Sequence, residues 1–325
     1  MKTFCFWIVK FSRYYALFLP LIFCIGTARG EERMKIILDT DIAGDIDDAF
    51  AQALVMVSPE FEVLGVTIAD GPTDKRALVS CRMLYDCGME HIPVAVGRPT
   101  RQGSAIPPQL LWGEGFDGFN PVNQPAADFI IGMLRKYPRQ ITIISVGPVT
   151  NLGDVIDRDP EAWKLVKAVY SMFGSFYMGY DGGPVPSAEW NVRADVKSAQ
   201  KFMASGVPIT FAGLDVTTMV TFDCDRRKQL SMRSSPLTDA LCGLYALWSS
   251  ESPGRDPVLY DPVAVSMALS GGFVTTRESH VRVTDEGYTV IDENSLPNCR
   301  IGMQIKKEEF LEWLTRRLIQ QNLNR

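Results

Sequence analysis

Five aspartates fall within ten residues near the start of the chain, in the segment MKIILDTDIAGDIDDAFA at residues 34–51. Carboxylates this close together repel one another unless water or a cation screens their charge. Ca²⁺ is the hard cation that best meets this need, because it takes roughly 6–8 oxygen ligands and many of them are carboxylates. The segment therefore predicts a Ca²⁺ site, with a solvated Asp-rich turn as the alternative. The five residues are Asp39, Asp41, Asp45, Asp47 and Asp48.

The elements on either side of this cluster must position it. An apolar run at Lys35–Leu38 is typical of a buried strand, and residues 49–57 continue as a helix. In open α/β sheets, ligands bind where a parallel strand ends and a helix begins. We therefore expect the carboxylates at the carboxyl end of the first strand of such a sheet.

Strand-like and helix-like segments alternate along the rest of the chain, which is typical of βαβ units and a largely parallel sheet. The fold class predicted is α/β, an open, mostly parallel sheet flanked by helices (Rossmann-like), with a small β-hairpin near the C-terminus. The expected strands are 61–68, 92–96, 140–146, 166–173 and 207–212, the expected helices are 75–85, 126–137, 237–248, 262–269 and 306–321, and the hairpin is expected in 279–299.

Residues 1–30 have the features of a secretory signal peptide, because basic residues precede the apolar run Ala16–Ile25 and small residues follow at Ala28 and Gly30. The run is shorter than the roughly 20 residues of a membrane span. We expect cleavage, no stable membrane insertion afterwards, and a secreted or periplasmic protein. A retained N-terminal anchor is the alternative. Residues 31–325 are expected to form one domain.

The expected mature chain is acidic. Residues 31–325 hold 29 basic and 38 acidic side chains, a net charge of −9. Phosphate contacts need a basic face, so nucleic acid is excluded as a partner. The five cysteines in this part are an odd number, which disfavours a fully paired disulfide framework, and we expect mostly buried thiols. A homo-oligomer and a monomer are both compatible with the sequence.

The pattern DTD…DIDDA at residues 39–49 resembles the N-terminal signature of the inosine–uridine-preferring nucleoside hydrolases. Further marks of that family follow in the expected order, and the resemblance covers most of residues 34–320. It implies a single nucleoside hydrolase-like domain at 31–325 and a small-molecule nucleoside as the substrate. The further marks are SVGPVTN at 145–151, AEWN at 188–191 with Asp195, and YDPVA at 260–264.

The resemblance also implies roles for particular residues. Asp41 matches the catalytic base, which also touches the metal, and Asp48 matches the aspartate that chelates Ca²⁺ through both oxygens. The backbone carbonyl of Thr150 and the carboxylate of Asp261 match the other metal ligands. A helix N-cap is the alternative for Thr150. Asp47 matches the residue that binds a ribose hydroxyl. The spacing of this motif leaves the role of Asp45 open.

Glu189 and Asn191 match the family's sugar-binding pair, and Trp112 falls in a region that contacts the base in relatives. Tyr260 stands where the inosine–uridine branch commonly has a His, so it either stacks on the base or donates a proton to it. Two other departures are Tyr180–Gly183, in place of an Asn that reaches the 5′-hydroxyl, and Asp70, near the family's Gly–Asn.

The function predicted is a secreted, Ca²⁺-dependent hydrolase that cleaves the N-glycosidic bond of ribonucleosides to give ribose and a free base. A hydrolase of another N-linked riboside and a non-catalytic Ca²⁺- or ribose-binding relative are the alternatives. The chain holds just two histidines, His91 and His280, and neither lies in a motif of this family.

Overall fold

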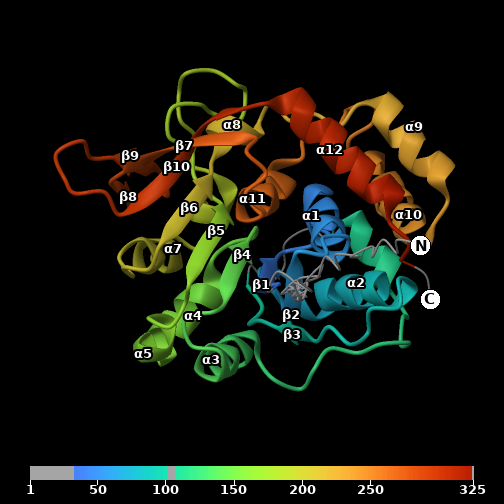
Figure 1. The fold of residues 1–325 in the computed structure, drawn as a ribbon, viewed down its shortest axis with the longest axis horizontal. Helices are drawn as coiled ribbons and strands as arrows, with labels where there is room; N and C mark the ends of the chain where they lie inside the picture. The colour runs from blue at the N-terminus through green and yellow to red at the C-terminus, as the bar shows by residue number, and fades with distance from the viewer. Residues whose placement is uncertain (1–32, 101–106, 324–325) are drawn as a thin grey trace, which may run out of the picture. The chain divides into compact units, whose positions relative to one another are not determined.

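An eight-stranded sheet forms the centre of the computed structural model, which describes residues 33–100 and 107–323 (Figure 1). The strand order is β3-β2-β1-β4-β5-β6-β10-β7, and a separate two-stranded sheet pairs β8 with β9. The strands are β1 (Met34–Thr40), β2 (Phe61–Ile68), β3 (Val94–Val96), β4 (Thr142–Ser145), β5 (Ala168–Met172), β6 (Ile209–Ala212), β7 (Val274–Ser279), β8 (Val281–Val283), β9 (Thr289–Ile291) and β10 (Cys299–Ile305).

The sheet is parallel except for β7, which runs antiparallel to β10 at one edge. From β1 the chain moves outward through β2 and β3, and it then returns to the other side of β1 with β4. The carboxyl ends of β1 and β4 are therefore adjacent at the point where the strand order reverses, which is the usual ligand crevice of such sheets. The predicted fold class is confirmed.

Two hydrophobic layers pack against opposite faces of the sheet, because successive side chains of a strand point to opposite faces. In β1, Ile36 and Leu38 pack with the first layer, while Ile37 packs with the second. The first layer includes residues of α1, α2, α10, α11 and α12, and the second includes residues of α3, α4 and α7. The helices thus lie on both faces of the sheet, as right-handed crossovers require.

The helices that matter for the site are α1 (Asp47–Met56), α2 (Thr73–Asp86), α4 (Thr150–Arg158), α6 (Trp190–Arg193), α10 (Pro236–Glu251) and α11 (Tyr260–Ala268). The first residues of α1 and of α11 belong to the predicted site. The other helices are η1 (Pro108–Gly113), α3 (Ala126–Lys136), α5 (Pro160–Trp163), α7 (Val196–Met203), α8 (Leu214–Thr217), α9 (Cys224–Arg233) and α12 (Lys307–Gln320).

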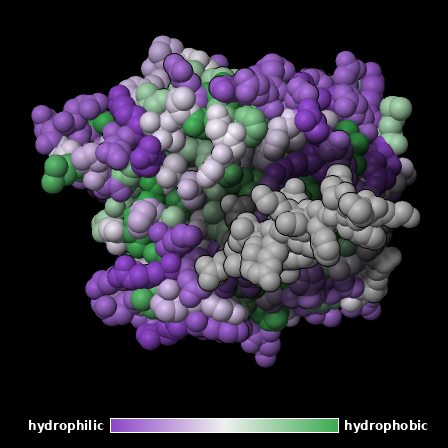
Figure 2. All heavy atoms as spheres, viewed as in Figure 1, coloured by the Kyte–Doolittle hydropathy of each residue, from purple (hydrophilic) through white to green (hydrophobic). Residues whose placement is uncertain are grey.

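The C-terminal part differs from the prediction in detail. The expected hairpin is present as β8 and β9, and β7 and β10 on either side of it form a second antiparallel pair that joins the main sheet. The last helix, α12, buries Phe310, Leu314 and Leu318. Figure 2 shows hydrophilic residues over its outer surface, as expected for an amphipathic helix.

The five cysteines in the described residues are free thiols, and Cys81, Cys87 and Cys299 are buried. In the same residues, no helix is both long enough and apolar enough to cross a membrane. The predicted signal peptide lies outside the described residues. From Arg33 onward the chain packs as one unit.

Candidate active site

Asp39 anchors the end of β1. Its buried carboxylate accepts hydrogen bonds from Thr67 Oγ1 at 2.6 Å and from Asn151 Nδ2 at 2.7 Å. Burial raises the pKa of Asp39 to about 6, although these hydrogen bonds oppose the rise. The side chain therefore ties β1 to β2 and α4, and it positions the loop that follows.

The loop after Asp39 folds back on the N-terminus of α1. The Thr40 hydroxyl donates to Asp48 Oδ1, and the backbone N–H of Asp41 donates to the same oxygen at 3.2 Å. Asp47 and Asp48 are the first two residues of α1, where the helix dipole favours negative charge. The loop thus holds the Asp48 carboxylate next to the Asp41 backbone.

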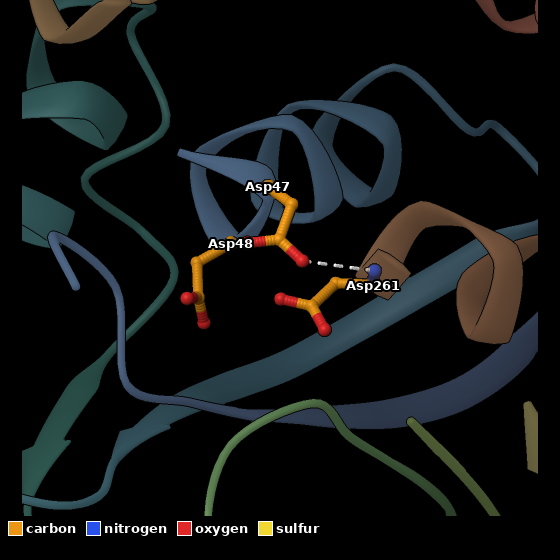
Figure 3. Close-up of side chains that lie close together, drawn as sticks. All are labelled: Asp47, Asp48 and Asp261. Carbon is orange, nitrogen blue, oxygen red and sulfur yellow. Dashed lines mark hydrogen bonds between the residues drawn. The ribbon is translucent and has the colours of Figure 1, made fainter. Parts of the chain in front are cut away.

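Asp261 joins this cluster from the first turn of α11, and its backbone N–H donates to Asp47 Oδ2 at 3.3 Å (Figure 3). One carboxylate oxygen from each of Asp47, Asp48 and Asp261 lies within 4.8 Å of the others, and all three residues are buried. Burial, followed by repulsion from neighbouring carboxylates, raises the pKa of each well above its ordinary value.

These three residues fit a bound divalent cation. Their negative charges are costly to bury without a positive partner, and the ligand atoms are all oxygens, as Ca²⁺ and Mg²⁺ prefer. The cluster could hold such an ion. The sequence analysis assigned Asp47 to a ribose hydroxyl, and its carboxylate lies beside those of Asp48 and Asp261.

Arg76 is a buried residue of the site that sequence reasoning missed. Its guanidinium donates to the carbonyls of Asp41 and Ile42, the latter at 2.7 Å. It also lies 3.8 Å from Asp41 Oδ2 and 3.9 Å from Asp70 Oδ2. Arg76 thus fixes the loop that carries Asp41, and Asp70 contacts this arginine. The sequence held a signal that Arg76 would be buried, because this residue shares a helix face with the apolar residues Val79 and Met83.

A cavity of about 510 Å³ opens over the aspartate cluster. Seven of the nine predicted site residues line it, and they come from three separate segments of the chain. The sequence motifs therefore predicted a single site from residues that lie far apart in the chain. Asp41 and Asp261, for example, are separated by 220 positions. The seven are Asp41, Asp47, Asp48, Glu189, Asn191, Tyr260 and Asp261.

Glu189 and Asn191 are held by the backbone around α6. The Glu189 carboxylate accepts hydrogen bonds from the N–H groups of Gly174 at 3.0 Å and Asn191 at 2.9 Å. Asn191 Nδ2 donates to the carbonyls of Val146 and Met172, each at 3.0 Å. Burial raises the pKa of Glu189, and the backbone hydrogen bonds oppose that rise. Both side chains have fixed orientations at the cavity.

Thr150 is not among the described residues that line the cavity. It begins α4, and its hydroxyl donates to Asp195 Oδ2 at 3.0 Å. A carbonyl at a helix start points along the helix, toward the N–H four residues later. Val146, four residues earlier and directly after β4, does line the cavity. The segment after β4 therefore reaches the cavity at Val146.

Trp112 is likewise absent from the described lining. The Arg82 guanidinium lies 4.5 Å from its ring centroid, and the ring packs on the first hydrophobic layer. The aromatic residues of the lining are Tyr180, Trp190, Trp248 and Tyr260. Trp248 was missed because it lies in a segment that reads as an ordinary amphipathic helix.

Comparison with known proteins gives a consistent result. The family model described as "Inosine-uridine preferring nucleoside hydrolase" matches residues 36–312. The chain is 30% identical to "Uridine nucleosidase 1" of Arabidopsis thaliana, over 79% of this chain and 80% of that one. It is also 30% identical to "Pyrimidine-specific ribonucleoside hydrolase RihA" of Klebsiella pneumoniae, over 88% of this chain and 98% of that one.

Solved structures share the fold. The "Plant nucleoside hydrolase - PpNRh1 enzyme" aligns with a TM-score of 0.79 at 23% identity, and the match covers 89% of this chain and 99% of that one. The "Purine-Preferring Ribonucleoside Hydrolase from Gardnerella vaginalis" aligns with a TM-score of 0.75 at 23% identity, covering 87% and 98%. At these identities the likeness concerns the fold alone.

Proposed function

The chain belongs to the inosine-uridine preferring nucleoside hydrolase family and is an N-ribosyl hydrolase of ribonucleosides, and we propose that it is an exported, Ca²⁺-dependent member. The observation that carries the proposal is that Asp47, Asp48 and Asp261 converge on one cavity with Glu189 and Asn191. The cavity thus combines ligands for a hard cation with polar groups that suit sugar hydroxyls.

We assign the cation to Asp41, Asp48 and Asp261, with the Val146 carbonyl in the place first expected for Thr150. Asp47 is close enough either to join this set or to bind a ribose hydroxyl. When bound, a divalent cation orients hydroxyl groups and lowers the pKa of a water molecule. Ca²⁺ suits a site of several carboxylates and a carbonyl, because it accepts many oxygens at flexible geometry.

The remaining chemistry belongs to side chains of this chain. Asp41 lines the cavity and takes the proton of the attacking water as general base. Glu189 and Asn191 hold the sugar hydroxyls, and their backbone partners keep them in position. As the C–N bond breaks, positive charge develops on the ribose ring, and the surrounding carboxylates stabilise that charge.

Export follows from residues 1–30, where a basic start, a short apolar run and small residues form a signal-peptide pattern. Mass spectrometry of the mature protein tests this. A chain that begins near residue 31 supports export with cleavage. Protein that retains residues 1–20 contradicts it.

A panel of ribonucleosides tests the activity and the metal together. Free reducing sugar is measured with metal-stripped protein and again after Ca²⁺, Mg²⁺ or Zn²⁺ is added back. We expect hydrolysis that is lost on stripping and restored best by Ca²⁺. The relatives' names include uridine, pyrimidine and purine substrates, so the panel contains uridine, cytidine, inosine and adenosine. Full activity of stripped protein would contradict the metal assignment.

A further inference from the structure

One part of the cavity combines aromatic rings with carboxylates that the proposed cation does not use. Trp248 and Glu251 lie three residues apart near the end of α10, so they share a helix face, and both line the cavity. Asp45, from the loop before α1, also lines it, and the Trp248 side chain lies close enough to Asp45 to favour its charged form. Tyr260 adds a second ring beside Asp261.

The cavity is lined by many more carboxyl groups than basic groups. Among the described lining residues, carboxylates outnumber basic groups seven to one, and the basic group is Arg76. Arg76 is engaged with the carbonyls of Asp41 and Ile42. Arg255 lies near enough to act electrostatically on Asp45 but does not line the cavity. A bound divalent cation offsets two charges, so the cavity stays anionic and attracts cations.

The described lining also lacks a good proton donor for a leaving base. No histidine or lysine lines it, and its hydroxyl groups belong to Ser252, Tyr180 and Tyr260. Tyr180 Oη accepts from the Trp190 N–H at 2.9 Å and lies 3.4 Å from Glu189 Oε1. A phenol is a weak acid, with an ordinary pKa of about 10. A neutral base that departs here without a proton leaves as an anion, inside an anionic cavity.

If the chain has the function proposed above, its cavity also selects among substrates: we propose that it prefers ribosides whose base carries a fixed positive charge, such as a quaternised ring nitrogen. Trp248 and Tyr260 supply aromatic rings at which a flat cation can bind, and Asp45 and Glu251 supply opposite charge. The water oxygen bonds to the anomeric carbon, and the C–N bond breaks. Its electron pair stays on the ring nitrogen and cancels the positive charge. The water's proton passes to Asp41 and then to solvent, so the base needs none.

The test uses the Ca²⁺-loaded enzyme and two pairs of probes matched in shape. Nicotinamide riboside is cationic and its dihydro form is neutral, while N7-methylinosine is cationic and inosine is neutral. The readout is the ratio of kcat/KM for the cationic member to that for the neutral member. Comparing this ratio between variants cancels the intrinsic reactivity of each probe.

We expect Glu251→Gln to lower this ratio by roughly three- to tenfold in both pairs, as one charge several ångströms away in a solvated cavity would. The matched control is Glu161→Gln, an exposed carboxylate on α5 that loses the same charge away from the cavity, and it should leave the ratio unchanged. Added salt should lower kcat/KM for the cationic probes more than for the neutral ones.

Two failures are distinguishable. If the enzyme hydrolyses inosine but Glu251→Gln leaves both ratios unchanged, or if neutral probes are preferred, the inference is overturned and the proposed function stands. If the Ca²⁺-loaded enzyme hydrolyses none of the probes and no nucleoside of the panel, both are overturned.

Discussion

Asp41 is the side chain that we expect to accept the proton of the attacking water. It follows β1 directly, its backbone N–H donates to Asp48, and its carboxylate lies 3.8 Å from Arg76 Nη2. Its carbonyl accepts a hydrogen bond from the same arginine. The backbone around this residue is therefore fixed from two sides, so a change to its side chain should alter chemistry more than position.

Replacing Asp41 by Asn keeps the shape and the ability to bind a hydroxyl, but an amide cannot accept the water's proton. We expect kcat to fall by at least about 10²-fold, the lower end for loss of a general base. The dissociation constant for ribose should change much less. Steady-state kinetics and a binding titration measure the two quantities. Asp74→Asn, an exposed change on α2, is the control. Near-normal kcat in Asp41→Asn would exclude Asp41 as the base.

Tyr260→Phe separates stacking from proton donation. Burial, and then the charges of Asp47 and Asp45, raise the pKa of the Tyr260 hydroxyl, which makes it a poorer acid. We therefore expect less than a tenfold loss of kcat, because the ring face is kept. Turnover is compared on a purine nucleoside and on a riboside with an activated leaving group. A loss of about 10²-fold on the purine that disappears on the activated substrate would identify Tyr260 as the acid.

At the scale of elements, the site depends on how closely β4 approaches the loop after β1. Gly147 follows β4, and a Cβ there would lie 2.7 Å from Asp41 Oδ1 and 2.8 Å from the Asp41 backbone nitrogen. The second contact is with backbone, so the β4 segment or the loop would have to move. The absence of a side chain at Gly147 lets Val146 and the aspartates line one cavity.

Gly147→Ala should therefore reduce kcat/KM by about 10- to 100-fold and weaken Ca²⁺ binding, since small displacements of catalytic groups cost this much. Activity, Ca²⁺ affinity and Tm are measured together. Gly132→Ala in α3 is the matched control, because the nearest atom to its added Cβ lies 3.9 Å away. That change should keep activity and raise stability by up to about 1 kcal/mol. Unchanged Ca²⁺ affinity in Gly147→Ala would contradict this account.

Most helices and strands could be predicted where the spacing of apolar residues and the length of the segment indicated the same kind of element. The strand at 61–68 was predicted with the bounds of β2, and the terminal helix differs by one residue at each end. The edge strand β7 was missed because it reads VTTRES, and a half-exposed edge carries no apolar run. Its pairing with β10 depends on a contact across about 25 residues that local pattern does not reveal.

The site was predictable where carboxylates and an amide carry the chemistry. Side chains such as Asp261 and Glu189 leave a type and a spacing in the sequence, and seven predicted residues line one cavity. A carbonyl ligand leaves no such trace, so the segment 145–151 alone does not distinguish Thr150 from Val146, which lines the cavity. Trp112 was expected at the cavity by region alone, and its ring instead packs against Arg82.

At the scale of the whole molecule, metal and protons compete for the same carboxylates. Without a cation, Asp39, Asp47, Asp48 and Asp261 have pKa values raised by burial, to about 6 for Asp39. Such groups bind more protons in the folded state than in the unfolded state. Their contribution to stability is therefore present below the unfolded pKa near 4, and it is lost as pH rises through the folded pKa.

Bound Ca²⁺ should reverse this trend, because a cation favours the ionised carboxylates and its binding releases protons. We expect the free energy of unfolding of metal-stripped protein to fall between about pH 4 and pH 7, while the stabilisation by added Ca²⁺ grows over the same range. At one hundred times the dissociation constant, that stabilisation is about 2.7 kcal/mol, which raises Tm by several degrees. Thermal unfolding of stripped protein, with and without Ca²⁺ at each pH, measures this stabilisation. Asp261→Asn is the matched variant, in which the Ca²⁺-induced rise in Tm should be smaller. A rise in Tm that is equal at pH 5 and pH 8, or that persists in full in Asp261→Asn, would show that Ca²⁺ does not bind at this cluster.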